Sequence, residues 1–226
     1  QEDVEHPRFH HAESVTRKMF ADNPDTDYLR APILLKPGRL YRIWGHIPEN
    51  ALYVGFVLYG KGGRIGNRLC DKDLKLDANN NFQLYISLDE QPGSIKSDAT
   101  ILKGDGDETA ILVRQYFSDR KQEMPISVDI ESLGDRKTPQ AFQAENFSTQ
   151  LGRAEWMLKS IYKRTRNTHH LATLTAVNNF IQVPGEELFQ TPDNTYSAAW
   201  YQLEEEQEIV ITGKPAKARY FGITLY

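Results

Sequence analysis

A short alternating stretch of this sequence carries an arginine and a tryptophan that could bind a polar ligand. Between Leu40 and Gly45 the residues alternate as in a β-strand, with Tyr41 and Ile43 on the apolar side. Arg42 and Trp44 therefore point away from the expected core. A guanidinium group beside an aromatic ring suits a sugar or an acidic small molecule.

Two later stretches add similar side chains. In residues 82–88 the apolar side chains share one strand face, and Tyr85 lies on the other. In residues 111–117 an apolar run is interrupted by Arg114, which precedes Tyr116 by two residues. We predict one concave sheet face lined by Arg42, Trp44, Tyr85, Arg114 and Tyr116.

Arg114 also has a purely structural interpretation. An unpaired charge inside a protein is very costly, so this arginine would pair with a carboxylate on a neighbouring strand. Three functions fit these residues: a ligand- or carbohydrate-binding module, a hydrolase of glycans or glycoconjugates, and a structural or assembly protein. Hydrolysis would need two carboxylates several ångströms apart. The acids available for it are Asp25, Asp119, Glu123, Asp129, Glu131 and Asp193.

Metal and cofactor chemistry finds little support in the sequence. The acidic stretch 22–27 (DNPDTD) carries oxygen ligands for Ca²⁺, but it lacks EF-hand spacing and reads as a turn that starts a strand. The histidines form no HExxH arrangement, and GKGGRIG (60–66) is not followed by the helix that a phosphate-binding loop requires. No GxSxG motif occurs, and Cys70 has no nearby histidine. We expect no metal and no cofactor, and no catalytic residue is assigned.

The composition of the chain limits the classes of partner that it could bind. The chain has 226 residues, a net charge of −4, 39% hydrophobic residues and scattered Lys and Arg, so it has no basic stripe for nucleic acid. No apolar run is long enough to span a bilayer. With one cysteine and neither Met nor a signal peptide at the opening QEDVEHP, both a cytoplasmic and a periplasmic or secreted location stay open.

A repeated unit organises the chain. Residues 24–59 and 192–226 align with one extra residue in the first copy, within residues 46–50. Matches spread over a whole unit indicate one supersecondary structure used twice. The matching pairs are Pro24/Pro192, Asp25/Asp193, Tyr28/Tyr196, Ala31/Ala199, Leu35/Leu203, Ile43/Ile211, Gly45/Gly213, Pro48/Pro215, Ala51/Ala218, Tyr53/Tyr220, Gly55/Gly222, Leu58/Leu225 and Tyr59/Tyr226.

The element pattern favours a mainly β fold. Short strands punctuated by Gly, Pro, Asp and Asn predict an antiparallel β-sandwich, interrupted by one α-helical segment. That helix is expected from about Glu145 to Arg166, and a shorter helical or irregular segment from His169 to Phe180. The apolar face of the helix expected at 145–166 comprises Phe147, Leu151, Ala154, Leu158, Ile161 and Thr165.

The expected domain organisation follows from these elements. A single structural domain would comprise an N-terminal arm (1–23), a first β unit (24–138), a helical insert (139–182) and a second β unit (183–226). The first copy continues past Tyr59 through two further strands to Phe117, whereas the second stops at Tyr226. We expect the chain to be a fragment of a longer protein. The alternative is an exposed sheet edge that another chain covers in an oligomer.

Four sequence runs carry a family resemblance. They are TRKMFADNPDTDYLRAPI (16–33), YRIWG (41–45), ILVRQYFSDRKQEMPISVDIE (111–131) and LEEEQEIVITGKPAKARYFGITLY (203–226). In this order they resemble the mostly bacterial "domain of unknown function 1214" family. The resemblance implies a β-sandwich of jelly-roll type, similar to the sandwich domains of peptide:N-glycanases, with a helical element attached.

The family has no established activity, so it supplies no catalytic residue. Its members usually run on past the LY segment, which agrees with the expectation of a fragment. One position departs from the family pattern: relatives often carry Trp where this chain has Arg120.

Overall fold

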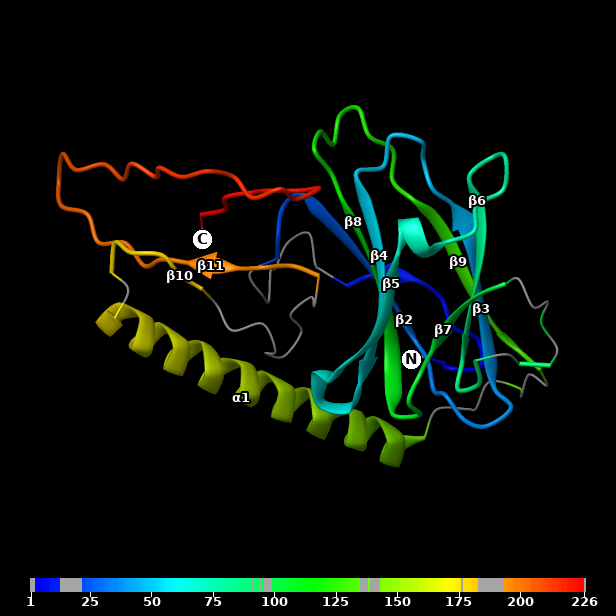
Figure 1. Cartoon of the computed structure of the whole chain (residues 1–226). Coiled ribbons are helices and arrows are strands. Elements are labelled where there is room, and N and C mark those ends of the chain that lie inside the picture. Colours follow the sequence, from blue (N-terminus) through cyan, green and yellow to red (C-terminus); the bar gives the residue numbers. More distant parts are fainter. Residues whose placement is uncertain are drawn as a thin grey trace. The chain divides into compact units, whose positions relative to one another are not determined.

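The computed structural model describes residues 3–12, 22–90, 92–93, 95, 99–134, 138, 143–175, 177–182 and 193–225. The chain divides into two compact units (Figure 1). The first unit comprises Gln1–Pro139 and Lys214–Tyr226, and the second comprises Gln140–Gly213. Each is described by itself.

The first unit is built from two β-sheets (Figure 1). All its strand pairs are antiparallel except β6 and β7, which run parallel. The five-stranded sheet has the order β1 (His10–His11), β2 (Thr26–Pro32), β8 (Glu108–Tyr116), β4 (Tyr53–Gly60) and β5 (Ile65–Cys70). The four-stranded sheet has the order β7 (Thr100–Lys103), β6 (Asn81–Ser87), β3 (Leu40–His46) and β9 (Ser127–Leu133). Two 3₁₀ turns, η1 (Lys61–Gly63) and η2 (Asp71–Asp73), flank β5.

The core of this unit draws side chains from both sheets, because alternate residues of each strand point inward. Tyr41 and Ile43 of β3 are fully buried, as the alternation of this stretch predicted, and so are Leu84 and Ile86 of β6. From the other sheet, β4 and β8 contribute a matching set: Val54, Phe56, Leu58, Ile111 and Val113. The two sheets therefore pack through one apolar layer.

The central strands of the five-stranded sheet are buried on their second face as well. Val57, Tyr59 and Ala110 lie on that face and form a second apolar cluster with Ile65 and Leu112. The sequence of a strand that is covered on both faces is apolar at nearly every position, and this explains the sequence YVGFVLYG of β4. The outer face of this sheet is consequently closed to solvent at its centre.

The second unit contains one long helix and a small strand pair. Helix α1 runs uninterrupted over Ala144–Thr175, and β10 (Ile181–Gln182) pairs with β11 (Ser197–Ala198). The break expected after Arg166 does not occur, because no Pro or Gly follows Gly152 before the end of the helix. Phe147, Leu151 and Leu158 of the predicted apolar face are exposed.

The two repeat copies differ in what they form. The first copy supplies β2, β3 and β4. In the second copy, the described residues 201–225 contain no strand. One local feature recurs in both: the tyrosine ring folds over the glycine two residues later. A Cβ on Gly55 would lie 2.7 Å from the hydroxyl oxygen of Tyr53, and one on Gly222 would lie 2.1 Å from that of Tyr220.

The fold is thus mainly β, with antiparallel sheets and one helix, as the sequence predicted. The described helix is not long and apolar enough to cross a membrane.

Candidate functional site

The outer face of the four-stranded sheet brings together three of the predicted ligand-binding residues. Arg42 and Trp44 alternate with the buried residues of β3, and Tyr85 lies directly opposite Arg42 on β6. On the other side of β3, Glu131 is opposite Arg42 and Asp129 is opposite Trp44. Because directly opposite residues share a face, these five side chains form one surface, called the β3 platform below.

The arginine at the centre of the β3 platform is held in place by its neighbours. Its Nη2 lies 2.5 Å from Oε1 of Glu131, and its guanidinium carbon lies 4.9 Å from the centre of the Trp44 ring. An ion pair and a cation–π contact together restrict the rotamers of Arg42. The group is therefore preorganised.

The tyrosine is oriented in a similar way. Its hydroxyl donates a hydrogen bond to Oε1 of Gln83, 3.0 Å away on the same strand. Gln83 is exposed and lies opposite Trp44, so its amide belongs to the same surface. Tyr85 and Trp44 are diagonal neighbours, and such positions lie about 7–8 Å apart in an antiparallel pair.

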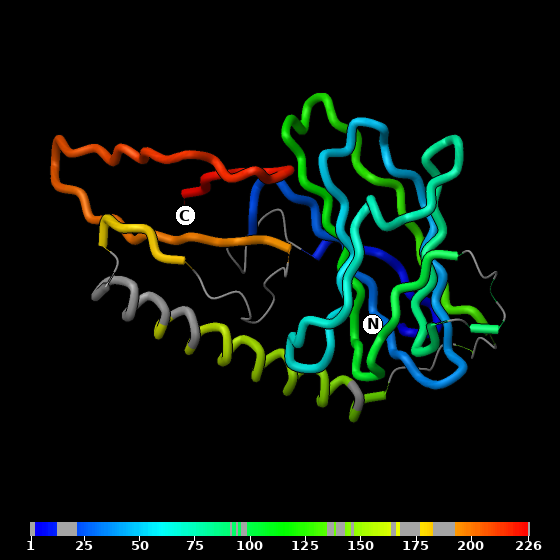
Figure 2. The backbone as a smooth tube through the Cα atoms, viewed as in Figure 1, coloured from blue at the N-terminus to red at the C-terminus, as the bar shows by residue number. Residues whose placement is uncertain are grey.

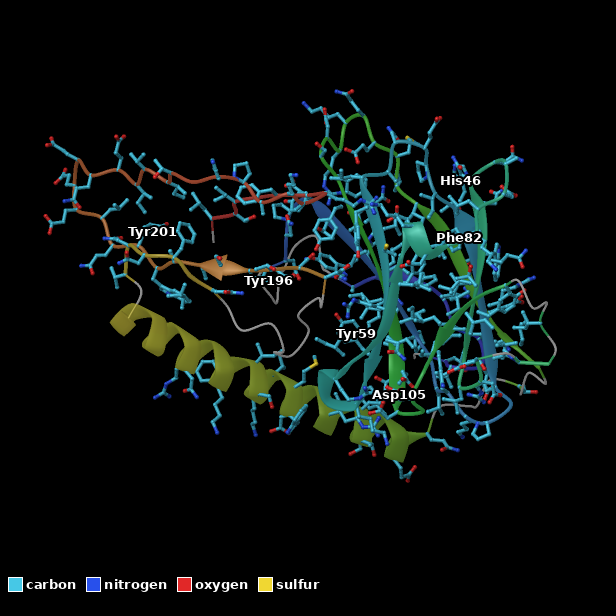
Figure 3. The ribbon with its side chains drawn as sticks, viewed as in Figure 1. His46, Tyr59, Phe82, Asp105, Tyr196 and Tyr201 are labelled. Carbon is cyan, nitrogen blue, oxygen red and sulfur yellow. The ribbon has the colours of Figure 1, made fainter. Side chains whose placement is uncertain are left out.

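Solvent can reach the β3 platform. The side chain of Arg42 is 36% exposed and that of Glu131 is 21% exposed. Trp44 and Tyr85 are partly exposed, and Asp129 is exposed. Figure 3 marks the end of this sheet by His46 of β3 and Phe82 of β6. The surface thus presents two partly exposed aromatic rings, a cation, carboxylates and an amide.

Arg114 and Tyr116 lie elsewhere, on the outer face of the five-stranded sheet. Their strand β8 pairs with β2 and β4 and not with β3, so the five predicted residues do not share one face. Both side chains are buried, with Arg114 opposite Tyr28 and Gly55. Burial removes them from direct contact with a ligand in solution.

Tyr116 belongs instead to a cluster of aromatic side chains. Its ring meets that of Tyr53 edge-on at 5.5 Å and that of Tyr220 at 4.9 Å. The Tyr220 hydroxyl donates to Oδ2 of Asp25 at 2.8 Å, and Nδ2 of Asn23 donates to that hydroxyl at 3.0 Å. Burial raises the pKa of Tyr220. Figure 2 shows the backbone of residues 214–225 meeting the start of β2.

Arg219 completes this contact, which we call the C-terminal clasp (Arg219 and Tyr220 with Asn23, Asp25 and Asp71). Its guanidinium donates to both carboxylate oxygens of Asp71, at 2.8 and 2.9 Å, and to the Leu52 carbonyl at 2.5 Å. The hydrogen bonds with Asp71 raise the pKa of Arg219. Sequence reasoning did not find this role. The signal available was the ARY motif, which belongs to the second repeat copy.

Polar side chains of the acidic stretch 22–27 form hydrogen bonds within the protein. Oδ1 of Asn23 accepts a hydrogen bond from the Asp25 amide, which makes an Asx turn, as the turn interpretation predicted. Arg120 donates to Asp27 at 2.7 Å and to the Pro24 carbonyl at 2.9 Å. Its guanidinium also covers the Phe117 ring at 4.4 Å.

The glycine-rich loop (60–66) and an acidic loop (105–108) contact each other. Gly62 and Gly63 adopt positive φ angles of 68° and 81°, and Arg64 follows them. Arg64 pairs with Asp107 and, at 3.3 Å, with Asp105. Glu108 is fully buried and accepts hydrogen bonds from the amides of Asp105 and Gly106. The hydrogen bond from Arg64 lowers the pKa of Asp107.

The other reactive residues serve the fold. Glu123 accepts hydrogen bonds from the amides of Ser118 and Asp119, which closes a turn. Burial raises the pKa of the Cys70 thiol, which disfavours the nucleophilic thiolate. Among the residues that the structure describes, no three His, Cys, Asp or Glu side chains converge as they would around a metal ion.

The comparisons with known proteins bear on the fold alone. No protein family matches the chain, and no curated protein does. The crystal structure of an uncharacterised protein from Burkholderia cenocepacia is similar, with a TM-score of 0.78 and 22% sequence identity. The match covers 89% of this chain and 56% of that one, so the chain spans about half the length of this relative. A protein from Vibrio parahaemolyticus aligns with a TM-score of 0.35 and 15% identity, over 47% of this chain and 30% of that chain.

Proposed function

We propose that this chain is a non-catalytic binding module that takes a carbohydrate on the β3 platform. The observation that carries the proposal is the arrangement of Trp44, Arg42 and Tyr85 on one accessible sheet face. Aromatic faces pack against the C–H groups of a sugar ring, and the flanking carboxylates, amide and guanidinium form hydrogen bonds with its hydroxyl groups. We further propose that the sandwich is of the jelly-roll type and that the chain belongs to the "domain of unknown function 1214" family.

The solvent exposure of the β3 platform sets an expected affinity for a ligand. Binding to a surface that needs no rearrangement costs little free energy for ordering side chains. A ligand on an open face, however, stays partly solvated and so buries little of its own surface. We expect a dissociation constant of about 0.1–1 mM for a short oligosaccharide, or roughly −4 to −5.5 kcal/mol. A glycan with an acidic substituent would also compete with Glu131 for Arg42, and it would bind more weakly at high salt.

Catalysis is the less favoured function because three of the six acids considered for it are engaged in the fold. Glu131 pairs with Arg42, Asp25 with Tyr220, and Glu123 caps a turn. A hydrolase would need one acid with a raised pKa facing a second carboxylate.

The test is a glycan array followed by titration of the strongest ligands against the wild-type chain and two tyrosine variants. Tyr85→Ala removes one ring of the β3 platform and is expected to weaken binding about five- to tenfold. Tyr201→Ala removes an exposed tyrosine of the second unit and is expected to leave binding unchanged. If both variants bind like the wild type, the ligand lies elsewhere. If the chain shortens the glycan during the titration, the hydrolase function replaces the proposal.

A further inference from the structure

The β3 platform carries an excess of negative charge. Its five side chains include one cation, Arg42, and two carboxylates, Asp129 and Glu131. Arg42 pairs with Glu131 at 2.5 Å, so these two charges offset each other. With His46 at the exposed end of β3 counted as neutral, the remaining charge is the carboxylate of Asp129.

The pairing of the strands separates the platform into two rows of directly opposite residues. One row runs from Glu131 through Arg42 to Tyr85, and its ion pair makes it neutral overall. The members of the neighbouring row are Asp129, Trp44 and Gln83. That second row therefore combines a carboxylate, an aromatic ring and an amide, and it contains no cation of its own.

Asp129 is the carboxylate of the platform that a ligand can reach. Its side chain is exposed, and no residue in the described part of the chain forms a hydrogen bond or an ion pair with it. It lies directly opposite Trp44, and the Cβ atoms of such pairs are about 4.5–5.5 Å apart. A carboxylate beside an aromatic ring attracts an ammonium group through an ion pair and a cation–π contact.

A ligand carboxylate would meet the opposite situation. To pair with Arg42 it must displace Glu131, which already holds the guanidinium. It would also be repelled by Asp129, because like charges on one face raise the free energy of the complex. The platform is therefore better suited to a cationic ligand than to an acidic one.

We propose that the carbohydrate preferred by the β3 platform carries a protonated amino group, as an oligosaccharide of glucosamine does. This inference rests on the proposed function, since it names the class of glycan that binds there. The ammonium group contacts Asp129 and the Trp44 ring, and Tyr85 packs against an adjacent sugar. N-acetylation removes the positive charge and with it the preference.

Three trisaccharides with the same β-1,4 linkage test this preference. Cellotriose has a hydroxyl group where chitotriose has an amino group, and tri-N-acetylchitotriose has an uncharged amide there. Isothermal titration at a pH that protonates the amines is expected to show chitotriose binding about five- to tenfold more tightly than cellotriose. Full N-acetylation should abolish this advantage, and high salt should reduce it because exposed charges are screened.

Two variants that each remove one carboxylate locate the ammonium group. Asp129→Asn is expected to reduce the preference for chitotriose over cellotriose by about threefold or more and to leave cellotriose binding unchanged. Its side chain is exposed, so the variant should fold, which circular dichroism can verify. Glu208→Gln changes an exposed residue of the second unit and should leave the binding of both trisaccharides unchanged.

The outcomes separate this inference from the proposed function. If chitotriose and cellotriose bind equally and Tyr85→Ala weakens both, the amine preference is overturned while the carbohydrate site stands. If no glycan binds, both proposals are overturned. Equal losses of chitotriose binding in Asp129→Asn and Glu208→Gln also overturn the inference, because the net charge of −4 would then attract the cationic sugar without a specific site.

Discussion

Gly45 of β3 is expected to tolerate no side chain. A Cβ on this residue would lie 1.9 Å from the carbonyl oxygen of Ser127 and 3.0 Å from the Cα of Val128. Both obstacles are backbone atoms of β9, with which β3 pairs in register. A change of rotamer cannot relieve the overlap, so Gly45→Ala must push the two strands apart.

The size of the effect follows from this overlap. Cβ atoms essentially never come closer than 3.0 Å to another heavy atom, so the strands must separate locally by more than 1 Å. One or two ladder hydrogen bonds would then be lost, at about 1 kcal/mol each. Overpacking adds about 1–3 kcal/mol. We expect the free energy of unfolding of the first unit to fall by roughly 2–5 kcal/mol.

The second repeat copy supplies the control. Gly213 is the counterpart of Gly45, and a Cβ there would have no heavy atom within 4 Å. Urea unfolding of the two variants, followed by circular dichroism, should therefore show a large loss for Gly45→Ala and a change within about 0.5 kcal/mol for Gly213→Ala. Equal losses, or a neutral Gly45→Ala, would refute the register of β3 and β9.

Two further predictions concern titratable contacts of the first unit. Tyr220→Phe removes a hydrogen bond to Asp25 and should lower the free energy of unfolding by about 1 kcal/mol, whereas Tyr201→Phe, at an exposed tyrosine, should not. Burial raises the pKa of Tyr220 above 10.0, so the stabilisation from its hydroxyl is present below that pH and is lost as the pH rises through the folded-state pKa. Tyr220→Phe should therefore flatten the fall in melting temperature above about pH 10. An unchanged slope would contradict this. Asp107 has a pKa lowered by Arg64, so its stabilising effect is present above pH 3.8 and lost as the pH falls below it. The side chains of Arg64 and Asp107 are exposed and screened by solvent, so Asp107→Asn should lower the free energy of unfolding by at most about 0.5 kcal/mol, and by less in high salt. A larger loss would contradict the inference that this loop contact is weak.

Local patterns in the sequence predicted the faces of individual strands. The alternation in residues 40–45 separated the buried Tyr41 and Ile43 from the accessible Arg42 and Trp44. The side-chain period of a strand depends only on its own backbone, so it can be read from a short stretch.

Pairing between strands could not be predicted in the same way. The sequence predicts one sheet face for Arg42, Arg114 and Tyr116, because each of them lies in a strand-like stretch. Alternation does not specify which sheet a strand joins, and β8 joins β2 and β4. The C-terminal clasp links Arg219 to Asp71 across 148 positions of sequence, so no local pattern could have revealed it.

The helix shows the limit of boundary prediction. The apolar pattern predicted its start near Glu145, and α1 begins at Ala144. Its end was expected too early because the periodicity weakens after Arg166, whereas the backbone continues until Thr175 in the absence of a helix-breaking residue.

Binding through Trp44 tests the central claim most directly. The chain has three tryptophans, and Trp156 is an exposed one on α1 that serves as the matched control. Isothermal titration of the strongest array glycan is expected to give at least tenfold weaker binding for Trp44→Ala, or a loss of about 1.4 kcal/mol, and unchanged binding for Trp156→Ala. Wild-type affinity in Trp44→Ala, or an equal loss in both variants, would contradict a carbohydrate site on the β3 platform.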